Sequence, residues 1–409
     1  MRIAFITGCL EPSSDGVGDY TRLLAQECDR QGHDCCLISL NDQFLAQVHH
    51  SEIELNDRRI PLLRLPANLT WNQRVAAAQT LLTSFQPDWV SLQFVPYSFQ
   101  RKGIVVGLSK RLRQLLQGQK LHVMFHELWI GASKSAKLKE RLVGRVQKFF
   151  ILGLVKQLQP LAVHTSNSTY IAMLKQYGIT ASRLPLFGNL PITQQDASDW
   201  LFPELQKLGL DIQPDNRDQY WLFGFFGTLQ PVWPAEPLFT YLHQAARQYH
   251  RKIIILSIGD LGPGEQLWEN LSSTYASQFV FSRLGKQAAA KVSAFLNTID
   301  FGVATSPYLL IGKSGTVATM LEHGVPVIVN RDDVQLAACP TSLQDYEPLL
   351  YKMGSDLPNI IGQTLNRLSP ASRLPSTVTK LLEDLVRLTT PQASTTMPQP
   401  EQKLRFTGG

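Results

Sequence analysis

The stretch that decides the fold reads Lys313-Ser314-Gly315-Thr316-Val317-Ala318-Thr319-Met320-Leu321-Glu322-His323-Gly324-Val325-Pro326-Val327-Ile328. Its small residues predict a loop, the segment after them predicts a helix, and the apolar run from Val325 predicts a buried strand. The first N–H groups of such a helix are unpaired and coincide with the positive end of its dipole. Ser314, Gly315, Thr316 and the charge of Lys313 therefore favour a bound phosphate. An ordinary tight loop with a helix cap is the alternative interpretation.

The same alternation of strand and helix runs through the rest of the chain. In the first half we expect strands at Arg2–Thr7, Asp34–Leu40, Trp89–Phe94, Leu121–Phe125 and Ala162–Thr165, with helices near 19–31, 71–85, 105–117 and 137–158. In the second half we expect strands at Leu222–Gly227, Lys252–Ile258, Phe279–Phe281 and Phe301–Ala304, with helices near 236–249, 266–275, 287–297 and 376–388. Short apolar strands separated by helices predict parallel sheets covered on both faces, with ligands beyond the carboxyl ends of the strands.

The length of 409 residues fits two domains of ordinary size. The segment between Pro191 and Asp218 is polar and broken by prolines, so we expect the boundary there. The expected division is an N-terminal domain over 1–195, a C-terminal domain over 215–368, a helix within 369–390 that crosses back to the N-terminal domain, and a tail over 391–409. Because the tail is rich in Thr, Gln and Pro, we expect it to be disordered.

Two doubly wound domains form a cleft between their strand ends, and ligands often bind at such an interface. The loops expected to open onto this cleft are Gly8–Gly18, Gly227–Pro237 and Pro307–Thr316.

The composition narrows the function. A hydrophobic content of 44% and a net charge of +6 describe a globular protein that suits an anionic small ligand or an anionic membrane surface better than nucleic acid. Four of the five cysteines lie in the first domain without metal-binding spacing, so we expect buried thiols in a reducing compartment. The start of the chain lacks a signal-peptide pattern and no apolar run is long enough to span a bilayer. We therefore expect a cytoplasmic protein.

Several motifs in order resemble those of GT-B glycosyltransferases, in particular the retaining family 4 (group 1) enzymes. The motifs are Asp15–Ala25 with Gly32-His33-Asp34, Pro87–Gln93, Phe125-His126-Glu127-Leu128, Val163–Ser168, Phe225–Leu229 and His323–Ile328. The resemblance covers about the first 365 residues. It implies an α/β protein with two doubly wound Rossmann-like domains facing across a cleft, and transfer of a hexose from a nucleotide-diphosphate sugar to a hydroxyl acceptor with retention of configuration.

The same resemblance assigns parts to individual residues. The donor would lie mainly on the C-terminal domain and the acceptor mainly on the N-terminal one. Gly16 and Gly18 would lie against the donor diphosphate or the acceptor, where a side chain would block the approach of the backbone. His126 would lie beside the donor sugar. No cofactor and no metal ion is implied, and the alternative for each residue is a plain turn glycine or an ordinary loop histidine.

The sequence departs from the family pattern at the donor site. The expected pair of glutamates falls at Ile311 and Thr319, and Glu322 lies one turn farther along the helix, so its substitution for Thr319 stays open. Thr228 stands in place of a basic residue. The diphosphate would then depend on Lys313, the helix start and Arg283. These departures leave two alternatives open, a catalytically silent GT-B protein that binds a glycan or a partner, and a GT-B sugar-nucleotide epimerase.

The stretch Lys134–Lys148 is strongly basic and carries apolar residues between its charges. Such a helix can lie on an anionic lipid surface, so peripheral contact with the inner membrane face is one interpretation. A solvated helix whose apolar side faces the core is the other, and the pattern alone favours it.

Overall fold

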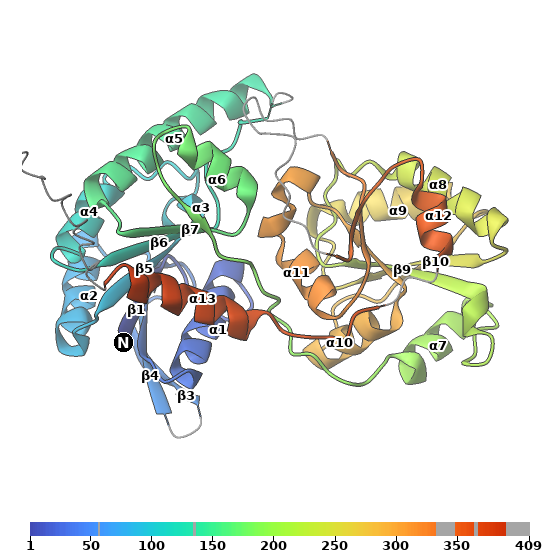
Figure 1. Cartoon of the computed structure of the whole chain (residues 1–409), viewed down its shortest axis with the longest axis horizontal. Coiled ribbons are helices and arrows are strands. Elements are labelled where there is room, and N and C mark those ends of the chain that lie inside the picture. The colour runs from blue at the N-terminus through green and yellow to red at the C-terminus, as the bar shows by residue number, and fades with distance from the viewer. Residues whose placement is uncertain (56–57, 134–135, 333–347, 364–366, 390–409) are drawn as a thin grey trace, which may run out of the picture.

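The computed structural model describes residues 1–55, 58–133, 136–332, 348–363 and 367–389. Within these ranges the chain forms two α/β units, each built on one sheet, that lie beside one another (Figure 1). Lys134, the first residue of the basic stretch, and the tail over 391–409, which we predicted to be disordered, lie outside the described residues. None of the helices in the described ranges combines the length and the apolar content that crossing a bilayer requires.

The N-terminal sheet has eight strands within the described residues, in the order β3-β4-β2-β1-β5-β6-β7-β8. All neighbours are parallel except β3 and β4, which form an antiparallel hairpin at the edge. The strands are β1 (Arg2–Thr7), β2 (Asp34–Asp42), β3 (His49–Leu55), β4 (Arg58–Pro66), β5 (Trp89–Phe94), β6 (Leu121–Phe125), β7 (Ala162–Thr165) and β8 (Ser182–Arg183). Five of them match the predicted strands in position, because β1, β2, β5, β6 and β7 are buried nearly throughout and read as continuous apolar runs.

Helices cover both faces of this sheet. One face packs against α2 (Trp71–Phe85), α4 (Leu108–Leu115), α5 (Leu138–Leu158) and α6 (Ser168–Lys175), and the short α3 (Pro96–Phe99) follows β5. The other face packs against α1 (Gly16–Arg30) and against α13 (Leu374–Arg387), which comes from the far end of the chain. α1 begins three residues earlier than predicted because Asp15 caps it, so Gly16 and Gly18 lie in its first turn rather than in a loop.

The C-terminal sheet has six parallel strands over the described ranges, in the order β11-β10-β9-β12-β13-β14. They are β9 (Tyr220–Phe226), β10 (Lys252–Ile258), β11 (Val280–Arg283), β12 (Phe301–Ala304), β13 (Val327–Val329) and β14 (Leu350–Lys352). The helices on its faces are α7 (Ser198–Gln206), α8 (Ala235–Gln248), α9 (Glu265–Thr274), α10 (Ala289–Thr298), α11 (Gly315–Glu322) and α12 (Leu357–Gly362), with short 3-10 turns at Arg217–Gln219, Gly262–Gly264 and Tyr308–Lys313.

The segment that we expected to be a linker contains a helix. α7 buries Leu201, Phe202 and Leu205 in the core of the C-terminal unit, even though Pro203 interrupts its sequence. The C-terminal unit therefore starts to pack near Ala197, before the expected position 215.

α13 ties the end of the described chain to the N-terminal unit (Figure 1). Leu381 is fully buried there, among residues of β1 and α1. We expect Leu381→Ala to lower the free energy of unfolding by about 3 kcal/mol, because the change removes buried methyl groups and leaves a cavity. Urea unfolding measures the loss. Leu388→Ala, at a half-exposed position just past the same helix, is the control and should change stability by less than about 0.5 kcal/mol.

The order of the strands fixes where ligands can bind. In the N-terminal sheet, β2 to β4 lie on one side of β1 and β5 to β8 lie on the other, so the strand order reverses between β1 and β5. In the C-terminal sheet the strand order reverses in the same way between β9 and β12. The loops that follow a reversal point diverge and leave a crevice beyond the carboxyl ends of the strands. The residues that follow β1, β5, β9 and β12 line one cavity, so the two crevices face each other.

Candidate active site

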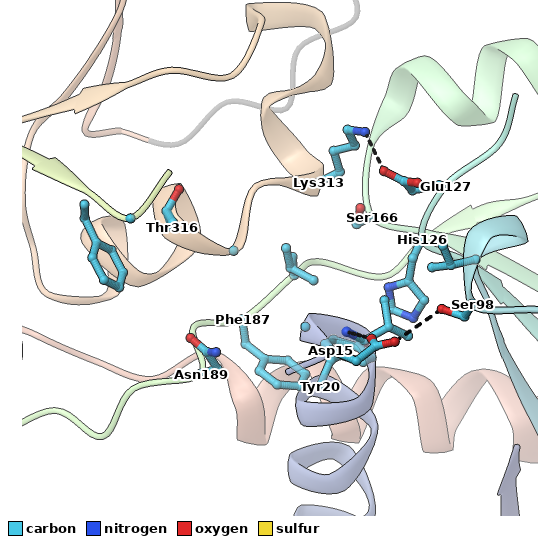
Figure 2. A pocket seen from close by; sticks show the side chains of 17 residues that line it. Asp15, Tyr20, Ser98, His126, Glu127, Ser166, Phe187, Asn189, Lys313 and Thr316 are labelled. Carbon is cyan, nitrogen blue, oxygen red and sulfur yellow. Dashed lines mark hydrogen bonds and ion pairs between the residues drawn. The ribbon is translucent and has the colours of Figure 1, made fainter. Parts of the chain in front are cut away.

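A cavity of about 580 Å³ lies between the two units (Figure 2). The N-terminal unit and the crossing segment that follows it contribute Asp15, Gly16, Val17, Tyr20, Val95, Ser98, His126, Glu127, Ser166, Leu186, Phe187 and Asn189, and the C-terminal unit contributes Phe226, Gly227, Lys313, Gly315 and Thr316. All three loops that we expected to open onto the cleft supply residues to this wall. The volume and the mixture of apolar and polar groups are typical of a small-molecule site.

Asp15 closes the amino end of α1 on the N-terminal side of the cavity. One of its carboxylate oxygens accepts hydrogen bonds from the N–H groups of Val17 (2.9 Å) and Gly18 (3.0 Å), and the other accepts one from Ser98 Oγ (3.3 Å). The first N–H groups of α1 therefore already face a negative charge. An anionic ligand gains little from this helix end.

His126 follows β6 and lies at the wall of the cavity (Figure 2). Its Nε2 is 2.9 Å from Oε1 of Gln93, and its ring forms a T-shaped contact with Tyr20, which in turn stacks on Phe187. Burial lowers the pKa of His126 to about 3. The imidazole is therefore neutral at physiological pH and offers one donor and one acceptor in place of a charge.

Lys313 reaches across the cavity from the C-terminal unit. Its Nζ lies 3.0 Å from Oε1 of Glu127 on the N-terminal unit, and the pair joins the two units (Figure 2). Burial acts to lower the pKa of Lys313, but Tyr170 and Glu127 outweigh it and raise the pKa above its ordinary value. The ammonium group is therefore charged at neutral pH, and both partners are partly exposed, so an incoming anion can reach it.

The amino end of α11 faces the cavity from the C-terminal side. Ser314 caps it with a neutral hydroxyl that accepts from Val317 N, and Gly315 and Thr316 line the cavity. The first N–H groups of a helix have no partner within the helix. Of the two helix ends at this cavity, α1 is thus neutralised by a carboxylate and α11 is not. The arrangement favours an anion beside α11 and Lys313.

The cavity brings together five of the predicted site residues, namely Gly16, His126, Lys313, Gly315 and Thr316. The other five, Gly18, Thr228, Arg283, Ser314 and Glu322, do not line it. Gly18 is buried against the preceding loop, where a Cβ atom would lie 2.8 Å from the carbonyl oxygen of Cys9. Its glycine serves the packing of α1. Arg283 is paired with Glu265 at the surface, and the Thr228 side chain is exposed.

Glu322 lies beside the two segments that cross between the units, outside the cavity. It is 2% exposed, and its Oε1 accepts from the backbone N–H of Arg373 (2.9 Å), which precedes α13. A backbone hydrogen bond from Gly188, in the other segment that crosses between the units, also reaches this carboxylate. Glu322 therefore does not replace the missing carboxylate at Thr319, whose hydroxyl donates to the Gly315 carbonyl oxygen. Ile311 is buried in the core of the C-terminal unit.

Several lining residues were absent from the sequence-based predictions. Asp15 and Glu127 are each adjacent in sequence to a predicted site residue, and this adjacency is the one sequence feature that could have indicated them. Phe187 and Asn189 lie on the segment that crosses between the units, and their sequence carries no pattern that marks a site. In the described part of the chain, no three His, Cys, Asp or Glu side chains gather so that they would hold a metal ion.

Comparison with solved structures decides the fold. The chain is similar to Anabaena Alr3699/HepE in complex with UDP and glucose (15% identity, TM-score 0.56, covering 95% of this chain and 100% of that one). It is equally similar to the catalytic domain of starch synthase IV from Arabidopsis thaliana bound to ADP and acarbose (14%, 0.56, 95% and 99%). The chain has the GT-B fold.

The chain is also similar to a glycosyltransferase from Rickettsia africae (11% identity, TM-score 0.51, covering 95% of this chain and 99% of that one). No protein-family model matches the chain, and no curated sequence matches it. The prediction of two Rossmann-like domains facing across a cleft is therefore confirmed, while the assignment to the retaining family 4 stays a prediction.

Proposed function

We propose that this protein is a glycosyltransferase that moves a hexose from a nucleotide-diphosphate sugar to a hydroxyl acceptor. The observation that carries the proposal is the cavity between two GT-B units, where the amino end of α11, capped only by the neutral hydroxyl of Ser314, meets the charge of Lys313. A nucleoside diphosphate supplies the anion that this wall lacks. Solved structures of the same fold contain UDP with glucose, which makes UDP-glucose the first donor to test.

The diphosphate would lie between α11 and Lys313. Charge develops on this group as the glycosidic bond breaks, and fixed donors at that point lower the barrier. Binding would turn the Lys313 ammonium group from Glu127 toward phosphate oxygens. The exchange is feasible because Lys313 and Glu127 side chains are 29% and 37% exposed, so water can solvate the carboxylate that is left behind.

The sugar would lie toward the N-terminal wall, between His126 and Asp15. Neutral His126 would exchange one hydrogen bond with a sugar hydroxyl. We propose retention of configuration, because the Asp15 carboxylate is engaged by three donors and has little freedom to act as the base that an inverting route needs. In that route the leaving diphosphate takes the acceptor proton. The anomeric configuration of the product, read by proton NMR, tests this choice.

Thermal shift with a panel of nucleotide sugars tests the function. We expect UDP-glucose or a related donor to raise the melting temperature at millimolar concentration, since a ligand that binds only the folded state stabilises it. No shift with any donor would contradict the proposal and favour the silent binding protein. Turnover of a binding donor in the absence of an acceptor, followed by NMR, would contradict it in favour of the epimerase.

We also propose that α5 rests on an anionic bilayer that carries the acceptor. Leu138, Leu142, Val146 and Phe149 are 74%, 52%, 41% and 72% exposed, and their spacing of four, four and three residues places them on one face of the helix. The core side of α5 consists instead of Gly144, Gln147, Ile151 and Leu154. The interpretation that the apolar residues of Lys134–Lys148 face the core is therefore wrong for Leu138, Leu142 and Val146.

Lys139, Arg141, Arg145 and Lys148 flank the exposed apolar face, and the combination suits acyl chains below a layer of anionic headgroups. We expect the protein to float with phosphatidylcholine vesicles that contain phosphatidylglycerol, and Leu142→Asp with Phe149→Asp to weaken binding at least about ten-fold, since each buried apolar side chain contributes roughly 1.5–3 kcal/mol. Val232→Asp, at an exposed apolar position of the C-terminal unit, is the control. Equal flotation of the double variant and the wild type would contradict this proposal.

A further inference from the structure

A row of polar side chains runs from the cavity to α13, along the face of the N-terminal sheet that packs against α1 and α13. Ser91 and Gln93 lie on β5, His122 lies on β6 opposite Ser91, and His164 lies on β7. All four are at most 2% exposed. Buried polar groups of this kind need hydrogen-bond partners, and here they provide them for one another.

The row ends at Asp384 on α13. Nε2 of His164 is 3.0 Å from Oδ2 of Asp384, and Lys380 and Arg387 each lie 2.9 Å from the same carboxylate. Burial acts to raise the pKa of Asp384, but Lys380 and His164 outweigh it and lower the pKa. The carboxylate is therefore ionised at neutral pH and can only accept hydrogen bonds.

The ionised carboxylate of Asp384 fixes which atom is the donor in each hydrogen bond of the row, beginning with His164. His164 must donate from Nε2 to Asp384, and burial lowers the pKa of His164, so its neutral ring leaves Nδ1 as an acceptor. Nε2 of His122 lies 3.0 Å from that Nδ1 and must donate to it. Burial also lowers the pKa of His122 well below its ordinary value. Its own Nδ1 is then an acceptor as well.

The same logic continues to the cavity. Ser91 Oγ lies 2.8 Å from Nδ1 of His122 and must donate to it, so the Ser91 oxygen is free only to accept. Gln93 therefore turns its NH₂ group toward Ser91, at 2.7 Å, and its carbonyl oxygen toward His126. That oxygen, 2.9 Å from Nε2 of His126, requires a proton on Nε2. The amide orientation and the tautomer of His126 are both determined.

We propose that Asp384 on α13 sets the tautomer of His126 at the cavity, through His164, His122, Ser91 and Gln93. His126 is held with its proton on Nε2, so Nδ1 is an obligatory hydrogen-bond acceptor, and it has no protein partner among the described residues. The inference that this acceptor selects a ligand hydroxyl rests on the proposed function. The assignment of the tautomer does not. The positioning residues for His126 are thus Asp384, His164, His122 and Ser91. Asp384 lies on α13, at the opposite end of the described chain.

Two-bond ¹⁵N–¹H NMR of the full chain labelled at histidine tests the proposal, because it reports the protonated nitrogen of each ring. We expect His126, assigned by the loss of its signals in His126→Gln, as a single Nε2–H tautomer. Ser91→Ala removes the donor to His122 and frees the Gln93 amide to turn over. Asp384→Leu removes the fixed acceptor at the far end. Each should convert His126 into a mixture of tautomers.

Thr165→Val is the matched control. Thr165 lies on β7 next to His164, is fully buried, and its hydroxyl has no hydrogen-bond partner among the described residues. This variant should leave His126 in the Nε2–H form. A proton on Nδ1 of His126 in the wild type, or an unchanged Nε2–H tautomer in both Ser91→Ala and Asp384→Leu, would overturn the proposal.

A titration with UDP-glucose separates this inference from the proposed function. If only the Nε2–H form binds the donor, the affinity falls in proportion to the fraction of that form, about two- to ten-fold for a mixture in which it makes up one half to one tenth. A tautomer change with no change in affinity supports the role of Asp384 and counts against the role of His126 at the donor sugar.

Discussion

Lys313→Ala is expected to weaken the binding of UDP about 10- to 100-fold. The lysine is the cation that the cavity offers to a diphosphate, and a hydrogen bond to a charged group contributes about 1.5–3 kcal/mol. The loss should shrink as the salt concentration rises, because the interaction is partly exposed. Isothermal titration calorimetry with UDP and with uridine measures it, and the affinity for uridine should not change.

Glu127→Gln is the matched control for this prediction. It removes the carboxylate that pairs with Lys313 and retains the shape of the side chain, so we expect UDP to bind about two- to five-fold more tightly. A Lys313→Ala variant that binds UDP within two-fold of the wild type would remove the lysine from the phosphate site.

Lowering the pH from 6.5 to 5 should destabilise the N-terminal unit, although most carboxylates titrate only at lower pH. Burial lowers the pKa of both His122 and His126, so both rings are neutral in the folded chain, while an unfolded histidine titrates near pH 6.5. Their contribution to stability is complete above pH 6.5 and is lost as the pH falls below it. At pH 5 the loss from His126, whose pKa is about 3, is about 2 kcal/mol, and His122 adds to the loss in the same direction.

Urea unfolding at a series of pH values between 8 and 5 measures this dependence. The His126→Gln variant has one buried histidine fewer and should lose about 2 kcal/mol less over the same range. A free energy of unfolding that is flat between pH 7 and 5 would show that these histidines are not held neutral.

The sequence predicts the sheets best where strands are buried on both faces. β1, β5, β6 and β7 read as apolar runs, and their predicted bounds agree with the structure. The hairpin of β3 and β4 was missed because β3 lies at the edge of the sheet and its sequence, His49–Leu55, is mostly polar. α7 was missed because it is short and because Pro203 interrupts its sequence.

The sequence predicted a site residue only where its position at the end of a strand or at the start of a helix is enough to bring it to the cavity. His126 follows a strand, and Gly315 and Thr316 begin a helix, so the fold brings them to the cavity. The pairing of Lys313 with Glu127 depends on how the two units face each other, which no local pattern encodes. The same holds for Glu322, which is one turn from the expected position and yet binds the segment that leads into α13.

The position of the diphosphate of a bound donor tests the central claim most directly. We predict that a crystal structure of the protein soaked with UDP-glucose will show the diphosphate in the cavity, within hydrogen-bonding distance of the N–H groups of Gly315 and Thr316 and of Lys313 Nζ, with the sugar toward His126. A diphosphate bound elsewhere, or a cavity that stays empty at a donor concentration that saturates the protein in solution, would contradict the account.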